Sequence, residues 1–531
     1  QSPPAKYGSG EIFFSEHGGA PFNLLELGTS GIRALRGNKI SMIFQEPMTS
    51  LNPVLSCGAQ VKEAILAHQR ISGKAAKQKT IELFQKVGLP EPSLIYSRYP
   101  HQLSGGQKQR VMIAMAMSCE PLLLIADEPT TALDVTVQKT ILHLICDLQR
   151  ENNMAVIFIT HDLGLVGEIA DRVLVMYRGK IVEQSNTAEI FTQPRHPYTR
   201  ALLACRPVLY AKDERLPVVG DFIAEDLPET DRNNQPAAKN TRRENMPAMV
   251  KTVKARDDQP ESEIDGTPML EVKNLKVWFP AKKNIIGRVL DYVKAVDDLS
   301  FNVNSGETLG LVGESGCGKT TLGRALLRLL SPTAGSIHFE GRDLMSIPDI
   351  EMRKLRKEMQ IIFQDPYSSL NPRITIGNAI LEPLRVHGMQ DTEKHRKEKV
   401  IELLEKVKLE PGHFNRYPHE FSGGQRQRIC IARALSLNPS FIVCDESVSA
   451  LDVSVQAQVL NLLSDLKQEF GFTTVFISHD LAVVHYISNR IMVMNKGRIE
   501  EIGPAEEVYR HPKREYTQKL IDSMPKGFIW N

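Results

Sequence analysis

The sequence predicts an α/β protein made of two tandem copies of one domain, and three observations support this fold class. Four short motifs each occur twice, with an almost constant spacing between the copies. Apolar runs typical of strands buried on both faces of a parallel sheet end in acidic residues. A glycine-rich segment between a predicted strand and a predicted helix has the pattern of a phosphate-binding loop.

The duplication is visible in the motifs themselves. The stretch "FQEPMTSLNP" from Phe44 returns as "FQDPYSSLNP" from Phe363, and "RYPHQLSGGQKQR" from Arg98 returns as "RYPHEFSGGQRQR" from Arg416. The stretches "DEPTTALDVTVQ" and "FITHDL" return as "DESVSALDVSVQ" and "FISHDL". Each pair is 318 or 319 residues apart. A constant offset over four motifs indicates a duplicated domain rather than a solenoid.

The repeat sets the expected boundaries: a first domain over 1–205, a linker over 206–268 and a second domain over 269–531. The intervening segment holds seven prolines and charge clusters such as "KARDDQPESEID", which are typical of a linker. A small ordered subdomain is the alternative.

Composition excludes several classes of protein. The chain has 531 residues, 42% of them hydrophobic and 24% charged, with a net charge of +2. That is an ordinary globular composition, too near neutral to indicate nucleic-acid binding. No apolar run approaches the ~18 residues of a membrane helix, and no secretory signal heads the sequence. The seven cysteines are scattered without a C-x-x-C pair, which fits a reducing compartment.

The segment "GESGCGKT" matches the phosphate-loop pattern. Its glycines let the backbone wrap phosphates at a helix N-terminus. Lys319 would contact the β- and γ-phosphates, and Thr320 would offer a hydroxyl to Mg²⁺. The helix terminus and Lys319 would also lower the pKa of Cys317 and leave a reactive thiolate; a small residue that simply fits is the alternative. The expected nucleotide-binding residues here are Gly313, Glu314, Ser315, Gly316, Cys317, Gly318, Lys319, Thr320 and Thr321.

The runs "LLLIADE" and "FIVCDE" end in paired acids. Asp127 and Asp445 would stand at a strand end and reach Mg²⁺ or its water. Glu128 and Glu446 follow, where they could polarise an attacking water, as hydrolysis in phosphate-loop proteins requires. One pair of acidic residues after a strand would more simply be explained as a helix cap. The same pair recurs at the same place in the second copy, which favours the catalytic role.

Each copy also carries a serine-glycine-glycine-glutamine motif before a predicted helix. Ser104 and Ser422 are natural N-caps, and the glycines free the backbone to approach an anion. An ordinary capped turn remains the alternative. The residues concerned are Ser104, Gly105, Gly106, Gln107, Ser422, Gly423, Gly424 and Gln425.

Two further residue types recur after predicted strands. A lone glutamine or histidine there is usually structural, and recurrence in both copies favours a functional role. These residues are Gln45, Gln364, His161 and His479.

Together these motifs resemble the nucleotide-binding domains of ATP-binding-cassette (ABC) transporters, over about 2–207 and from 269 to the C-terminus. The motifs "FQEPMTSLNP", "RYPHQLSGGQ" and "HPYTRALL" (196–203) are similar to those of the oligopeptide and dipeptide import branch. The second tail, "REYTQKLI" (514–521), is a weaker match. The fusion of two such domains in one chain resembles the double ATPases of glutathione and peptide importers. Ser447, where most members have proline, is similar to the glutathione-importer group.

The resemblance implies two tandem P-loop nucleotide-hydrolase domains, each with a RecA-like core and a helical signature subdomain, the first lacking its N-terminal part. It implies ATP and Mg²⁺ as cofactors. The implied catalytic residues are Glu446, His479, Gln364, Glu128, His161 and Gln45. The implied metal-binding residues are Thr320, Gln364, Asp445 and Asp127. Phe279 would stack on adenine, with Trp278 and Tyr292 as the other candidates.

Family architecture further implies head-to-tail packing of the two domains, as a pseudo-dimer or within a homodimer. The Lys319 site would then be closed by 104–107, with Asp134 nearby, and the opposite site by 422–424.

The implied function is the ATP-hydrolysing motor of an importer of small peptides such as glutathione or di- and oligopeptides. The implied partners are two transmembrane permease subunits and, indirectly, an extracytoplasmic substrate-binding protein, but no nucleic acid. The chain would lie peripherally on the cytoplasmic side of the inner membrane. One alternative is a non-transport ATPase of the same superfamily that acts on ribosomes or nucleic acid. Another is a nucleotide-sensing regulator, against which Glu446 argues.

The first copy has no phosphate loop, because the counterpart of Lys319 would precede residue 1. We expect that the sequence is a piece of a longer chain, since Asp127, Glu128 and His161 are retained and the core of the first copy would need the missing strand. A true loss of the site is the alternative.

Overall fold

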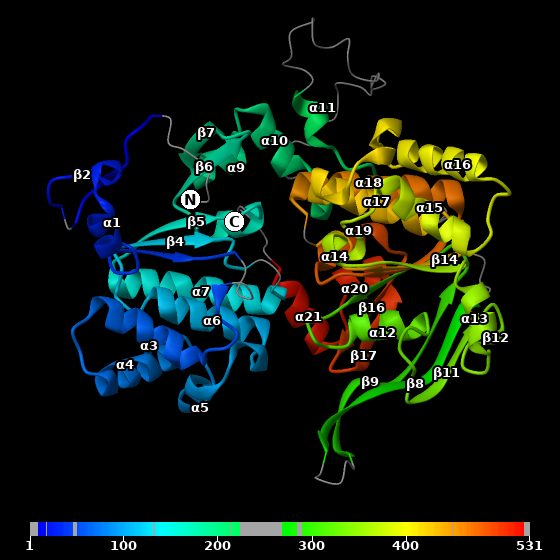
Figure 1. The fold of residues 1–531 in the computed structure, drawn as a ribbon, viewed down its shortest axis with the longest axis horizontal. Helices are drawn as coiled ribbons and strands as arrows, with labels where there is room; N and C mark the ends of the chain where they lie inside the picture. Colours follow the sequence, from blue (N-terminus) through cyan, green and yellow to red (C-terminus); the bar gives the residue numbers. More distant parts are fainter. Residues whose placement is uncertain are drawn as a thin grey trace, which may run out of the picture. The chain divides into compact units, whose positions relative to one another are not determined.

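The computed structural model describes 9–16, 18–45, 50–130, 133–212, 214–223, 268–283, 289–449 and 451–524. The chain forms two compact units (Figure 1). Unit 1 comprises Gln1–Leu133 and Val137–Ala170, and unit 2 comprises Asp134–Thr136 and Asp171–Asn531. Most of the expected linker, 224–267, lies outside the described residues.

Unit 1 is built on a three-stranded parallel sheet in the order β3-β4-β5, with an antiparallel pair, β1-β2, near the start of the chain. Its strands are β1 (Phe13–Phe14), β2 (Phe22–Asn23), β3 (Ile40–Ile43), β4 (Leu123–Asp127) and β5 (Ala155–Ile159). Its helices are η1 (Leu24–Glu26), α1 (Thr29–Leu35), α3 (Cys57–His68), α4 (Gly73–Lys86), α5 (Pro92–Ser97), η2 (Pro100–Gln102), α6 (Gly105–Ala116), α7 (Val135–Asn152) and α8 (Leu163–Ile169).

The periodicity of the sequence explains the packing of α7. Its buried residues are Ile141, Leu142, Ile145 and Leu148, which lie along one face of a helix with 3.6 residues per turn. Ile141, Ile145 and Leu148 join buried side chains of α3, α4 and α6 in the core of unit 1.

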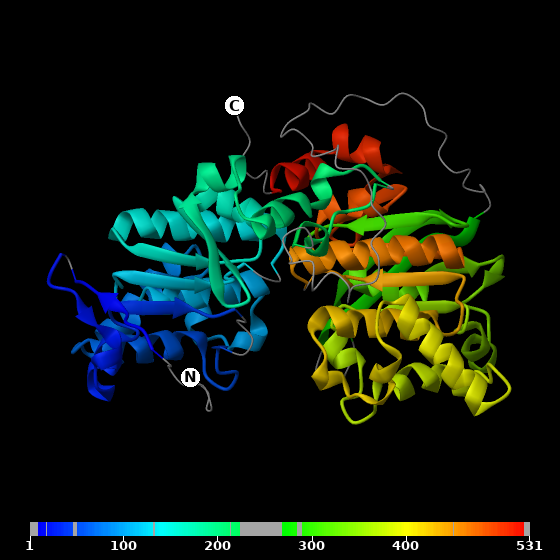
Figure 2. The same cartoon turned by 90° about the horizontal axis from the view of Figure 1, so that it is seen from above.

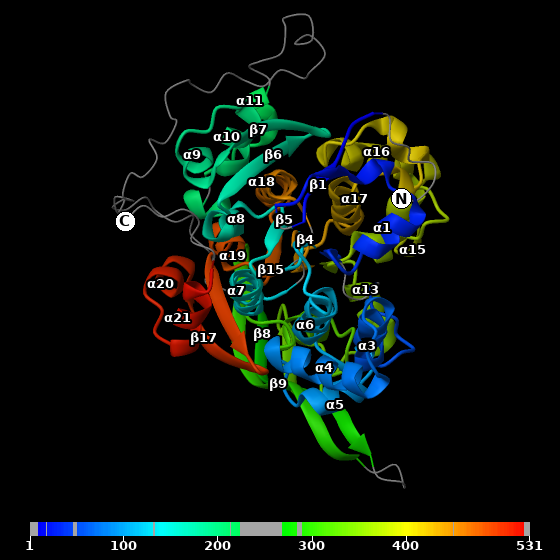
Figure 3. The same cartoon turned by 90° about the vertical axis from the view of Figure 1, so that its left-hand side faces the viewer.

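Unit 2 contains a six-stranded sheet in the order β13-β14-β15-β10-β16-β17, parallel except for the last pair. A separate antiparallel sheet has the order β12-β11-β8-β9, and β6 pairs with β7. In Figures 1 and 3, β8 and β9 run together as a long green ribbon. The strands are β6 (Arg172–Tyr177), β7 (Lys180–Asn186), β8 (Pro268–Lys283), β9 (Val289–Asn304), β10 (Thr308–Val312), β11 (Ala334–Phe339), β12 (Arg342–Asp343), β13 (Met359–Ile362), β14 (Phe441–Asp445), β15 (Thr473–Ile477), β16 (Arg490–Asn495) and β17 (Arg498–Pro504).

The helices of unit 2 pack on these sheets; the orange α18 runs alongside the strands in Figure 2. They are α9 (Thr187–Thr192), α10 (Pro197–Ala204), η3 (Pro207–Leu209), α11 (Val219–Ile223), α12 (Lys319–Leu326), α13 (Asp349–Leu355), α14 (Pro366–Ser369), α15 (Ile376–Val386), α16 (Glu393–Lys406), η5 (Pro411–Asn415), η6 (Pro418–Glu420), α17 (Gly423–Leu435), α18 (Val453–Phe470), α19 (Leu481–Ile487), α20 (Ala505–Arg510) and α21 (Glu515–Asp522).

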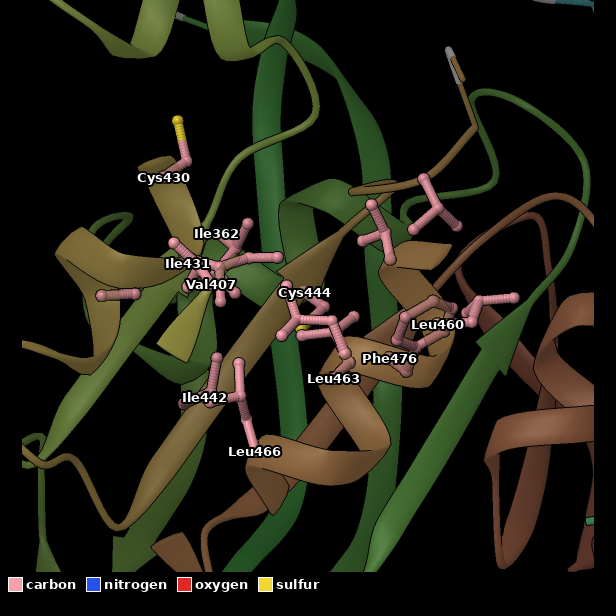
Figure 4. Close-up of a cluster of buried hydrophobic side chains, with 14 of the residues drawn as sticks. Ile362, Val407, Cys430, Ile431, Ile442, Cys444, Leu460, Leu463, Leu466 and Phe476 are labelled. Atoms are coloured by element: carbon pink, nitrogen blue, oxygen red, sulfur yellow. The ribbon is translucent and has the colours of Figure 1, made fainter. Parts of the chain in front are cut away.

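The core of unit 2 explains the long apolar runs of the sequence. Every residue of β10, β14 and β15 is buried, as expected for strands covered on both faces. Figure 4 shows Cys444 of β14 beside Leu463 of α18 and Ile442 of β14 beside Leu466, with Phe476 of β15 close to Leu460.

The segment that follows α10 packs as a strap against the second copy; we use "strap" for 205–223. Cys205 and Leu216 are fully buried in the core that contains α18 and α19. The side chain of Asn461 on α18 pairs with the backbone of Leu216, accepting from its N–H at 3.0 Å and donating to its carbonyl at 2.8 Å.

Polar contacts extend this attachment of the strap. The hydroxyl of Tyr486 on α19 donates to the carbonyl of Glu214 at 2.7 Å, and Arg215 forms a two-pronged ion pair with Asp465 at 3.0 and 3.3 Å. The compact units therefore do not coincide with the repeat: the tail of the first copy, from Asp171, belongs to unit 2.

Candidate active site

The phosphate loop lies between β10 and α12, as the sequence predicted. Two positions of the loop must be glycine because backbone atoms of other segments lie where a Cβ would be. Gly313 has φ 152°, and a Cβ there would lie 2.1 Å from the carbonyl oxygen of Met494. Gly318 has φ 109°, and a Cβ would lie 2.0 Å from the carbonyl oxygen of Ala295. Any side chain at either position would clash with backbone, so the loop keeps its shape only with glycine.

Lys319 begins α12 and is buried, with 4% of its side chain exposed. Its Nζ donates to the carbonyl oxygens of Gly313 at 2.7 Å and of Glu314 at 3.0 Å. The same nitrogen lies 4.0 Å from Oε1 of Glu446. The ammonium group therefore lies between the loop and the acidic pair, where a cation can balance phosphate charge.

Asp445 ends β14 and approaches the helix that follows the loop. The hydroxyl of Thr320 donates to Oδ1 of Asp445 at 3.0 Å. Burial raises the pKa of Asp445, although the Thr320 hydrogen bond opposes the shift. A hydroxyl and a carboxylate side by side offer the hard oxygen ligands that Mg²⁺ prefers, with room in its shell for phosphate oxygens.

Glu446 is the residue around which the predicted catalytic side chains gather. Nε2 of Gln364 donates to its Oε2 at 2.7 Å, and Nδ1 of His479 lies 3.5 Å from the same oxygen. Glu446 adopts φ 47°, and its N–H bonds to the carbonyl of Ile477 at 2.9 Å, which turns the chain at the strand end.

Two charged neighbours determine the titration of Glu446. Burial alone would raise its pKa, but the hydrogen bond and charge of His479 and the charge of Lys319 outweigh it and lower the pKa. Burial likewise lowers the pKa of His479, while its bond to Glu446 and the charge of that carboxylate raise it overall. Glu446 is therefore held as a carboxylate and can orient a water molecule.

The first copy repeats this geometry. Gln45 Nε2 donates to Oε2 of Glu128 at 2.8 Å, and Nδ1 of His161 lies 3.0 Å from Oε1. Glu128 also has a positive φ of 44°, with its N–H on the carbonyl of Ile159 at 2.9 Å. Asp127 ends β4 as Asp445 ends β14. In each copy the glutamine, glutamate and histidine that the sequence singled out therefore lie together.

The two copies differ at the strand beside this cluster. In unit 2, β10 pairs with β15, and Val475 and Ile477 are wholly buried. Their counterparts on β5, Ile157 and Ile159, are 50% and 44% exposed. Among the described residues of unit 1, β5 is the edge strand of its sheet. In unit 2, Val475 and Ile477 pack in a core that contains Leu322 and Leu326 of α12, the helix that follows the phosphate loop.

The two serine-glycine-glycine-glutamine motifs, 104–107 and 422–425, are called the signatures below. Their serines cap the following helices, as predicted. The backbone N–H of Gln107 bonds to Ser104 Oγ at 3.3 Å, and the N–H of Ser104 bonds back to Oε1 of Gln107 at 3.1 Å. Ser422 and Gln425 form the same reciprocal box at 3.4 and 3.0 Å.

The second glycine of each signature has a packing role that sequence reasoning missed. A Cβ on Gly106 would meet Val137 at 2.7 Å, and one on Gly424 would meet Val455 at 2.3 Å. Gly105 and Gly423 begin α6 and α17; a Cβ on Gly423 would meet no atom within 4 Å.

The expectation for Cys317 is wrong. Burial raises the pKa of its thiol, outweighing the opposing charge and backbone contact of Lys319. The side chain is 7% exposed and packs in the core beneath the loop. Cys317 is therefore a small buried residue rather than a reactive thiolate.

The aromatic candidates for an adenine contact lie on β8 and β9. Phe279 is 40% and Tyr292 45% exposed, whereas Trp278 lies under the ammonium group of Lys294, 4.7 Å from the ring centroid. Phe279 stays a prediction.

The side chains of three residues outside the loop form hydrogen bonds with it. Within unit 2, the hydroxyl of Thr136 donates to Oε1 of Glu314 at 2.9 Å, and Asp134 accepts from the N–H of Ser315. The backbone N–H of Glu314 bonds to the hydroxyl of Tyr516 at 3.2 Å. Sequence reasoning gave Tyr516 no role, although its recurrence as Tyr198, 318 positions earlier, was available as a signal.

A phosphate loop beside a carboxylate pair at the end of a buried parallel strand defines a P-loop nucleotide hydrolase. The sequence matches the ABC transporter family over 9–131 and 296–449, and the C-terminal region of oligopeptide/dipeptide transporters over 182–235 and 501–527. The chain belongs to the ABC transporter family, as an ATPase of the oligopeptide and dipeptide branch.

Curated relatives have similar sequences over most of the chain. The Glutathione import ATP-binding protein GsiA of Pectobacterium atrosepticum is 49% identical over 97% of this chain and 79% of its own. The protein of the same name from Escherichia coli K12 is 51% identical over 94% and 77%. A solved structure, the dimeric post-hydrolysis state of the ATP-binding cassette MJ0796 bound to ADP and Pi, is 28% identical with a TM-score of 0.41, covering 45% of this chain and 99% of that one.

No helix among the described residues is long and apolar enough to cross a membrane.

Proposed function

We propose that this chain is the ATP-hydrolysing subunit of an importer for small peptides such as glutathione. The observation that carries the proposal is the convergence of Lys319, Thr320, Asp445 and Glu446 at one end of a parallel sheet. Relatives named as glutathione import ATP-binding proteins cover most of the chain and support the choice of cargo.

The proposed chemistry assigns one task to each group. The loop amides and Lys319 hold the phosphates, and Thr320 and Asp445, with Gln364, bind Mg²⁺. Bound Mg²⁺ would neutralise charge on the transferred phosphoryl group. Glu446 orients the attacking water, and His479 and Gln364 hold Glu446 in place through the contacts described above.

We further propose that the two signature segments, 104–107 and 422–425, act on nucleotide held by the opposite copy, and that Glu128, His161, Gln45 and Asp127 serve a second site. The proposed partners are two membrane permeases that bind the chain at the cytoplasmic face of the inner membrane, with an external binding protein that delivers cargo.

Uptake of labelled glutathione by cells that lack their own importer tests the proposal. Cells given the chain with its permeases and binding protein should accumulate label, and cells given Glu446→Gln should not. Equal uptake by both would reject the motor role. Uptake of a labelled dipeptide but not of glutathione would correct the cargo.

The alternative of an ATPase that acts on ribosomes or nucleic acid has a separate test. Affinity purification from cells should recover membrane permeases. Recovery of ribosomes in their place would favour the alternative.

A further inference from the structure

The C-terminal helix α21 reaches the phosphate loop through one side chain. Tyr516, the second residue of α21, accepts a hydrogen bond from the backbone N–H of Glu314 at 3.2 Å. Glu314 directly follows Gly313 in the loop and is itself partly buried. Glu314 lies in no helix or strand, so its N–H has no acceptor within regular secondary structure. A partly buried N–H without an acceptor costs free energy, and the Tyr516 hydroxyl supplies one here.

The hydroxyl is held firmly because buried residues that follow Tyr516 anchor α21. Thr517 is fully buried and Leu520 is 4% exposed, and both follow Tyr516 in the helix. Leu520 belongs to the core of unit 2, and the Tyr516 ring packs against that core. Burial raises the pKa of Tyr516, and the charge of Glu314 adds to the shift while the Glu314 N–H opposes it. The side chain is therefore a neutral, fixed acceptor.

The other end of the contact is a loop whose backbone must keep one shape. Lys319 donates to the carbonyls of Gly313 and Glu314, so the residues that bond to the lysine are also the ones that the tyrosine restrains. Loss of the Tyr516 hydroxyl would leave this turn with more freedom. A loop that must be ordered on binding binds more weakly than a preorganised one.

We propose that Tyr516 is a positioning residue for nucleotide binding, and that its hydroxyl fixes the phosphate loop of its own domain through the N–H of Glu314. The inference rests on the proposed binding of a nucleoside triphosphate at this loop. It gives the C-terminal region of the second copy a direct part in that binding.

The test compares two changes that each remove one hydroxyl from this region of the full chain. Tyr516→Phe keeps the ring and removes the acceptor. Tyr509→Phe is the matched control, since Tyr509 lies on α20 with its ring stacked on His485 at 4.2 Å. The measurement is the Kd of a non-hydrolysable ATP analogue with Mg²⁺, followed by KM and kcat for ATP.

We expect Tyr516→Phe to raise Kd and KM about three- to tenfold, which corresponds to the loss of one hydrogen bond. The kcat should stay within about twofold of wild type, because the hydroxyl holds the loop equally in the ground state and the transition state. Tyr509→Phe should change none of them. Amide exchange of a peptide that covers 313–317 should speed up only in Tyr516→Phe. Unchanged Kd, or equal effects of both variants, would overturn the inference even if the melting temperature falls. Wild type that binds no nucleotide, or Lys319→Ala that binds normally, would reject the proposed site instead.

Discussion

Gln364 donates a hydrogen bond of 2.7 Å to Glu446, and the first copy of the domain repeats the bond between Gln45 and Glu128. The acceptor in each case has a positive φ and follows a strand that ends in aspartate. The duplicated geometry gives the test at Glu446 a matched control at Glu128.

The first prediction uses that pairing. Glu446→Gln should abolish steady-state ATP hydrolysis but preserve ATP binding, because the amide keeps its size and loses the charge that orients water. Glu128→Gln should lower hydrolysis less than Glu446→Gln, because Lys319 and Thr320, which are proposed to hold phosphate and Mg²⁺, lie beside Asp445 and Glu446. Phosphate release and nucleotide binding are measured on the purified full chain. Equal loss in both variants would place the reaction elsewhere.

Lys319→Ala should lower ATP hydrolysis about a hundredfold, which is the usual cost of removing one group that stabilises transition-state charge. Lys354→Ala, an exposed lysine on α13, is the control for a lost positive charge. Initial rates at several ATP concentrations separate binding from turnover. Activity of Lys319→Ala near that of the control would contradict the assignment.

Thiol chemistry at Cys317 should be slow and should speed up with pH. The raised pKa leaves little thiolate at neutral pH, and the thiolate is the nucleophile. Alkylation at pH 7 should therefore spare ATP hydrolysis, and the rate at Cys317 should still be rising above pH 9. Mass spectrometry of the loop peptide after iodoacetamide treatment measures the rate. Rapid labelling at pH 7 that bound ATP prevents would restore the reactive-thiolate hypothesis.

The strap should contribute to the stability of unit 2 chiefly through burial. Leu216→Ala removes a buried side chain and should lower the free energy of unfolding by about 2–5 kcal/mol. Arg215→Ala breaks only an exposed ion pair and should cost less than about 1 kcal/mol. Denaturant unfolding followed by circular dichroism compares the two. A larger cost for Arg215→Ala would mean that charge, rather than packing, holds the strap.

Sequence reasoning located side chains that lie together better than it located the limits of the compact units. Motif spacing singled out Gln364, Glu446 and His479 because they recur in both copies, and the structure brings these three side chains together. It failed for Cys317, because proximity to a helix terminus suggested a low pKa while the surrounding core, which desolvates the thiol, was invisible in the sequence. It also gave no sign that Leu216 is buried, since proline and charge around it resemble a linker and its partner Asn461 lies 245 residues away.

The attachment of the strap has a practical consequence for anyone who dissects this protein by recombinant expression. A second copy produced alone from Met269 would leave α18 and α19 without Cys205 and Leu216, exposing an apolar strip to solvent. Such a strip favours aggregation. A soluble second copy should be sought by co-expression with a peptide that carries 205–223. Changing the residue at which the second copy begins would not restore the strap.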